Sequence, residues 1–141
     1  MKTTILVLIT AAMLAAQAPD FSKVEIKTTR LAPNFYVLEG AGGATGALVG
    51  PDGVLMVDSQ FAPLTTKLVA AINQISGNAP IRFLINTHQH GDHTGGNENF
   101  GRLGVTILST NDLRARLAQP VTVQRPAALC APRIRLLRCP P

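Results

Sequence analysis

The chain has 141 residues, enough for one small domain, and its 46% hydrophobic content favours a globular core over a disordered chain. The formal net charge of +5 comes entirely from the C-terminal end: residues 1–112 hold seven basic and eight acidic side chains, a net charge of −1, and six arginines follow. No aromatic residue is interleaved with these arginines, so nucleic-acid binding is not expected.

Residues 1–18 predict a secretory signal peptide. Lys2 provides a cationic start, an apolar run extends to Ala16, and Ala16-Gln17-Ala18 supplies the small residues of a cleavage site. The run is too short to span a bilayer comfortably, and a buried helix is the alternative. We therefore expect export to the periplasm or the cell exterior, with no stable membrane span after removal of the signal.

Four short strands joined by tight turns are expected next. They cover residues 24–31, 35–39, 47–49 and 54–57. Between the second and third, the glycine-rich stretch from Gly40 to Gly46 matches neither a dinucleotide-binding fingerprint nor a Walker A motif. It is interpreted as a turn into the third strand.

An amphipathic helix is predicted over residues 63–75, because apolar residues such as Leu64, Leu68 and Ile72 recur at three- and four-residue spacing. Further elements alternate along the chain after it. They are a strand at 81–86, a helical turn at 98–101, a strand at 105–108 and a helix from Thr110 or Asn111 to Leu117. This alternation predicts a layered α/β fold.

The strongest signal is the run from Thr87 to Gly96, which contains all three histidines of the chain. His88 and His90 are two residues apart and project to the same side of an extended chain. Gly91 then permits a turn, so that Asp92 and His93 face a neighbouring point. One metal could bind His88 and His90, and a second Asp92 and His93; imidazole and carboxylate together suit zinc or iron.

The pattern His88-x-His90-x-Asp92-His93, preceded by Thr87 and followed by Gly95-Gly96-Asn97, resembles the signature of the metallo-beta-lactamase fold superfamily. The resemblance extends over about residues 23–118. The segment from Gly53 to Ser59 looks like that family's strand ending in an aspartate, which implies that Asp58 supports the metal site. Without the resemblance, a functional role for Asp58 and Ser59 and a structural role as a turn or helix cap would be equally favoured.

The resemblance implies part of an αββα sandwich, a mixed sheet with flanking helices, with residues 19–118 as the N-terminal half of the domain. It also implies a hydrolase with one or two zinc ions, whose activated water attacks an ester, amide or related bond of a small-molecule substrate. Asp92 would be catalytic, orienting that water in addition to binding metal. Iron held by the same four residues is the alternative cofactor.

The family completes its metal sites with downstream histidines, whereas no histidine follows His93 here. Each ion would have two protein ligands, against three in a catalytic zinc site. We therefore expect a truncated, impaired enzyme, with an inactive metal-binding fragment as the alternative. An uncovered apolar face and an unpaired sheet edge would favour self-association.

Residues 119–141 contain five of the ten prolines and both cysteines, Cys130 and Cys139. Proline at this density breaks helices and sheet ladders, so a disordered tail is expected. Our hypothesis is that this tail is not native family sequence and results from a frameshift or a misplaced gene end. A third function remains open: an exported basic module that binds partners through the tail arginines.

Overall fold

The computed structural model describes residues 20–119. The expected signal peptide and the tail from residue 120 onward lie outside the described residues, so export and tail disorder stay predictions. Within the described range, no helix has both the length and the apolar character needed to cross a bilayer.

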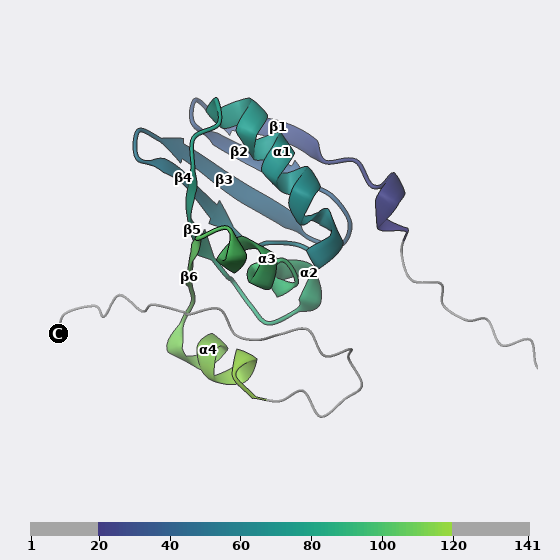
Figure 1. The fold of residues 1–141 in the computed structure, drawn as a ribbon, viewed down its shortest axis with the longest axis vertical. Helices are drawn as coiled ribbons and strands as arrows, with labels where there is room; N and C mark the ends of the chain where they lie inside the picture. The colour runs from purple at the N-terminus through teal and green to yellow at the C-terminus, as the bar shows by residue number, and fades with distance from the viewer. Residues whose placement is uncertain (1–19, 120–141) are drawn as a thin grey trace, which may run out of the picture.

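A six-stranded mixed sheet forms the centre of the structure, and its strands follow one another in chain order (Figure 1). They are β1 (Lys27–Ala32), β2 (Phe35–Glu39), β3 (Ala44–Gly50), β4 (Gly53–Val57), β5 (Ile81–Ile85) and β6 (Thr106–Leu108). The pairs from β1 to β4 are antiparallel, whereas β4–β5 and β5–β6 are parallel. Parallel neighbours require a crossover connection, which here runs through a helix each time.

The helices occupy these connections and the two ends of the described chain. They are the 3-10 turns η1 (Phe21–Lys23) and η2 (Ala62–Leu64), and the α-helices α1 (Thr65–Ser76), α2 (Gly91–Thr94), α3 (Asn97–Arg102) and α4 (Asn111–Leu117). The α/β class with a mixed sheet and flanking helices is therefore confirmed.

The first strand begins three residues later than predicted, at Lys27, because the segment before it is held by a side chain. The ammonium group of Lys67 donates to the carbonyl oxygens of Phe21, Ser22 and Val24 at 3.1, 2.7 and 2.6 Å. These bonds fasten η1 and the following residues to α1. The third strand instead begins earlier than predicted, because Ala44 and Thr45 pair with Glu39 and Leu38.

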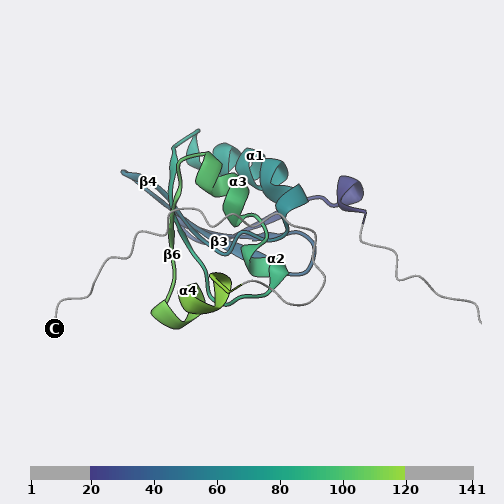
Figure 2. The same ribbon diagram turned by 60° about the horizontal axis from the view of Figure 1, so that its bottom comes forward.

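Helices α1 and α3 lie together on one side of the sheet (Figure 2), and the core forms between them and the strands. The strands contribute alternate residues to it, as a period of two requires. Fully or almost fully buried core side chains include Leu38, Ala47, Met56, Leu64, Leu68, Ile72, Leu84, Phe100 and Ile107. The predicted helical spacing of Leu64, Leu68 and Ile72 thus becomes the contact between η2, α1 and the sheet.

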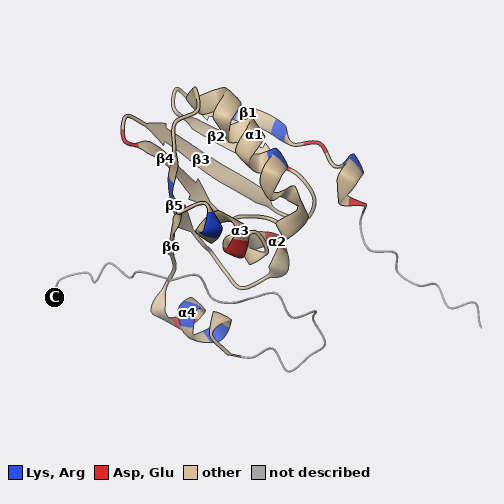
Figure 3. Ribbon diagram, in the orientation of Figure 1, with Lys and Arg blue, Asp and Glu red and all other residues tan. Residues whose placement is uncertain are grey.

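The side of the sheet opposite α1 and α3 also carries apolar residues. Charged residues are sparse along the central strands β2 and β3 (Figure 3). Phe35, Leu48, Leu55 and Phe83 are register partners in succession, so they form one row across β2 to β5. Leu48 remains 40% exposed and Phe83 38% exposed. The prediction of self-association assumed an uncovered apolar face, and this row is such a face. Self-association itself stays a prediction.

Replacing Leu68 with alanine is expected to lower the free energy of unfolding by about 2–5 kcal/mol, because the side chain is fully buried and its removal leaves a cavity. Leu103→Ala is the matched control, since Leu103 is 61% exposed and its truncation is expected to cost about 0.5 kcal/mol or less. Denaturant unfolding followed by circular dichroism measures both. Equal losses for the two variants would contradict this assignment of the core.

Candidate metal centre

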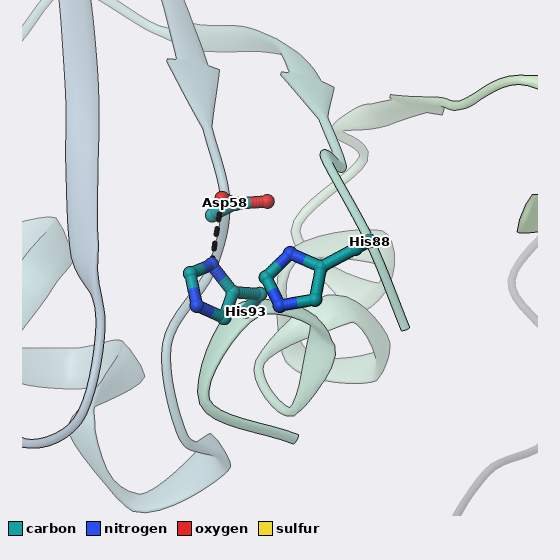
Figure 4. A group of neighbouring side chains, drawn as sticks. All are labelled: Asp58, His88 and His93. Carbon is teal, nitrogen blue, oxygen red and sulfur yellow. Dashed lines mark hydrogen bonds and ion pairs between the residues drawn. The ribbon is translucent and has the colours of Figure 1, made fainter. Parts of the chain in front are cut away.

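The candidate site lies where β4 and β5 end. These strands are parallel, with Val57 opposite Ile85, so the residues that follow each strand emerge at the same edge of the sheet. Asp58 follows β4, the loop with Thr87 and His88 follows β5, and α2 then brings His93 back toward Asp58 (Figure 4). Parallel pairing therefore places residues about thirty positions apart side by side.

The carboxylate of Asp58 is at the centre of this arrangement, and the residue is only 4% exposed. Its Oδ1 accepts the Thr87 backbone N–H at 2.8 Å. Its Oδ2 accepts the Thr87 hydroxyl at 2.7 Å and the Nδ1 of His93 at 2.8 Å. Asp58 adopts a φ of 63°, a left-handed conformation that costs a non-glycine residue about 1 kcal/mol or more. These three bonds hold the residue in that conformation.

These bonds fix which nitrogen of two histidines carries the proton. A carboxylate only accepts, so His93 donates from Nδ1 and keeps the lone pair on Nε2. The Thr87 proton is used by Asp58, so the Thr87 oxygen accepts from His88 Nδ1 at 3.0 Å, which leaves the His88 lone pair on Nε2 as well. Asp58 therefore determines the tautomer of both imidazole rings, that of His93 directly and that of His88 through Thr87.

Four potential ligand atoms form two close pairs. His88 Nε2 lies 3.1 Å from His90 Nδ1, and His93 Nε2 lies 3.4 Å from Asp92 Oδ2. The His88 and His93 rings are neighbours, with centroids 4.0 Å apart, so the two pairs are adjacent. These are the two pairs that the sequence motif assigned to a first and a second metal ion.

The spacing within each pair fits a zinc ion. Two ligand atoms at about 2.0–2.1 Å from tetrahedral zinc are about 3.3 Å apart, close to both separations. The side chains of Asp92 and His93 are 29% and 21% exposed, so an ion can approach them from solvent. Metal binding by His88, His90, Asp92 and His93 remains a prediction, which the donor chemistry and spacing support.

Asp58, His88 and His93 also offer ligand atoms within 4.8 Å of one another. This trio is a poorer cage than the two pairs, because both Asp58 oxygens already accept hydrogen bonds from the chain. Carboxylates that orient metal-binding imidazoles in this way are common beside metal sites. The geometry thus favours a supporting role for Asp58, as the sequence resemblance implied.

The glycine-rich loop has a role that sequence reasoning missed. A Cβ atom on Gly42 would lie 2.9 Å from Asp92 Cβ, and one on Gly43 would lie 2.7 Å from the Asp92 carbonyl oxygen. The loop backbone therefore packs directly against the residues of the second pair. Clustered glycines are a known signal of close backbone approach, but the sequence did not indicate which segment approaches.

Solved structures with a similar fold are metallo-beta-lactamases. That from Hirschia baltica matches with a TM-score of 0.58 and 20% identity, covering 65% of this chain and 46% of its own. A subclass B3 enzyme of Bradyrhizobium japonicum matches at 0.60 and 22%, covering 70% and 38%. One from Pseudomonas aeruginosa, in its mono-zinc form, matches at 0.58 and 18%, covering 65% and 45%. The predicted partial fold is thus confirmed, and the chain spans less than half the length of each of these proteins.

Comparison with curated protein sequences finds no significant match. The family model described as the metallo-beta-lactamase superfamily, in contrast, matches residues 30–123, well over half of the chain. This match includes β2 to β6, Asp58 and the whole histidine motif. The chain therefore belongs to the metallo-beta-lactamase superfamily.

Proposed function

We propose that this chain carries the first two ligands of each ion in a zinc-dependent hydrolase that acts on small-molecule substrates. One observation carries the proposal: the two donor pairs, His88 with His90 and Asp92 with His93, have the separations that tetrahedral zinc requires. Membership of the superfamily supports the hydrolase class. A similar solved structure in a mono-zinc form supports zinc over iron.

Bound zinc would supply an activated water at neutral pH and stabilise negative charge that develops on a substrate oxygen. The chain's own residues prepare this chemistry. Asp58 and Thr87 keep the protons of His88 and His93 on Nδ1, so both Nε2 lone pairs point into the site. Asp92, which is partly exposed, would orient the attacking water and accept its proton.

The donor set from the described residues is partial. Residues 20–119 offer two donors to each ion, and all three histidines of the chain are already used. A catalytic zinc site normally has three protein ligands. The 141-residue polypeptide is therefore expected to bind zinc weakly and to lose it when dialysed against a mild chelator. Metal analysis after dialysis tests this, and retention of stoichiometric zinc would contradict it.

Turnover is the direct test of the proposed activity. With zinc in excess, slow hydrolysis of a chromogenic beta-lactam or an aryl ester is expected, and a chelator should abolish it. Asp92→Asn should remove this activity, whereas the control Asp112→Asn, at an exposed residue on α4, should retain it. Hydrolysis that survives chelation would contradict the proposal, and zinc binding without turnover would favour the metal-binding fragment.

The supporting role of Asp58 gives a separate prediction. Asp58→Asn replaces one acceptor oxygen with an NH₂ group. At the Oδ1 position this group opposes the Thr87 N–H, whereas at the Oδ2 position it donates to His93 Nδ1, so that His93 presents a protonated Nε2 to the site. The zinc Kd is expected to rise about 10–100-fold, measured by competition with a chelating dye. Asp52→Asn, in an exposed turn, is the control and should leave the Kd unchanged.

A further inference from the structure

A second polar cluster lies behind the candidate metal centre and is almost completely buried. Ser59 is 0% exposed, Asn86 3% and Asn97 5%. They come from three places: the residue after Asp58, the residue after β5 and the first residue of α3. Burying uncharged polar groups is unfavourable unless they are hydrogen bonded, so the partners of this cluster reveal its role.

The two asparagine side chains bond to each other in both directions. Asn97 Nδ2 donates to Asn86 Oδ1 at 2.7 Å, and Asn86 Nδ2 donates to Asn97 Oδ1 at 3.1 Å. The Ser59 hydroxyl also donates to Asn97 Oδ1 at 2.9 Å. Each amide is therefore locked in one orientation, because a flip would place like groups face to face.

The cluster converges on a single acceptor, the backbone carbonyl oxygen of His93. That oxygen accepts from the Ser59 N–H at 2.8 Å, and it lies 3.1 Å from Ser59 Oγ and 3.3 Å from Asn86 Nδ2. A carbonyl has two lone pairs, so its accepting capacity is fully used. The backbone position of His93 is thus defined from both strand ends at once.

This anchoring matters because α2 has four residues, Gly91–Thr94. A single helical turn has no stability of its own, so its placement depends on contacts from outside. Asp92 and His93 both lie on α2, whereas His88 and His90 precede it. His88 is held separately, through the chain of hydrogen bonds from its Nδ1 to Thr87 and Asp58.

We propose that Asn86 and Asn97 are positioning residues that hold α2 so that Asp92 and His93 form a donor pair, while His88 is set independently by Thr87. The inference rests on the proposed metal site for its consequence in function. The effect of Asn86 and Asn97 on His93 is measured in the metal-free chain. The result therefore does not depend on whether the chain hydrolyses any substrate.

The test uses the full chain after treatment with a chelator, with the histidine rings labelled with ¹⁵N. NMR at a pH well above the ordinary pKa of imidazole identifies which nitrogen carries the proton in each ring. In the unmodified chain, His88 and His93 are both expected to be protonated on Nδ1. In Asn97→Ala, His93 should become a mixture of the two tautomers, because the contact to Asp58 loosens, and His88 should not change.

Asn99→Ala is the matched control, since Asn99 lies on the same helix but donates to Ala62 and Thr65 instead. It should leave both rings unchanged. If Asn97→Ala does not fold, the milder Ser59→Ala, which removes one hydroxyl of the cluster, is used in its place. It should likewise produce a mixture of tautomers at His93 and leave His88 unchanged. A merely structural cluster would leave both tautomers intact or alter both rings alike, and either result would overturn the proposal.

Discussion

The site depends on one buried carboxylate, that of Asp58, and on the three hydrogen bonds that it accepts. Its donors are 29 and 35 positions further along the chain, at Thr87 and His93. Asp58 is 4% exposed, and a buried carboxylate is stable only if its oxygens accept hydrogen bonds. The loop after β5 and the helix α2 must therefore both return to it. The same bonds that satisfy Asp58 also direct two imidazole lone pairs into the site.

The sheet supplies the other half of this constraint. Because β4 and β5 are parallel neighbours, both chain segments leave the sheet at the same edge, where Asp58, Ser59, Asn86 and Thr87 meet. Ser59 and Asn86 face one side of α2 and bind its backbone, whereas Asp58 binds a side chain of the same helix. One short helix is therefore held by two adjacent and chemically different clusters.

Several strand and helix positions and the donor pairs could be predicted from the sequence, because the signals that determine them are local. The second strand was predicted at its observed bounds, Phe35–Glu39. The helix predicted over residues 63–75 ends one residue later, at Ser76, and is capped by Gly77 with a φ of 64°. The spacing of His88, His90, Asp92 and His93 indicated two donor pairs, and the same atoms pair in space.

Features that depend on distant segments could not be predicted. The start of β1 is set by Lys67, which lies some forty residues further along the chain. The contact of Gly42 and Gly43 with α2 is tertiary as well. So is the hydrogen bond from the Thr87 hydroxyl to Asp58, which leaves the Thr87 oxygen to accept from His88. Periodicity and motif spacing describe neighbours along the chain, so they contain no information on these contacts.

The topology also bears on the order in which the molecule assembles. Strands β1 to β4 form a meander of antiparallel neighbours joined by short connections, whereas the pairing of β4 with β5 must wait for the chain to cross over through α1. Contacts between residues close in sequence form at a smaller loss of chain entropy, so the meander is expected to form first. Asp58 then reaches its place before any of its donors, and the ligand-bearing loop is among the last parts to settle.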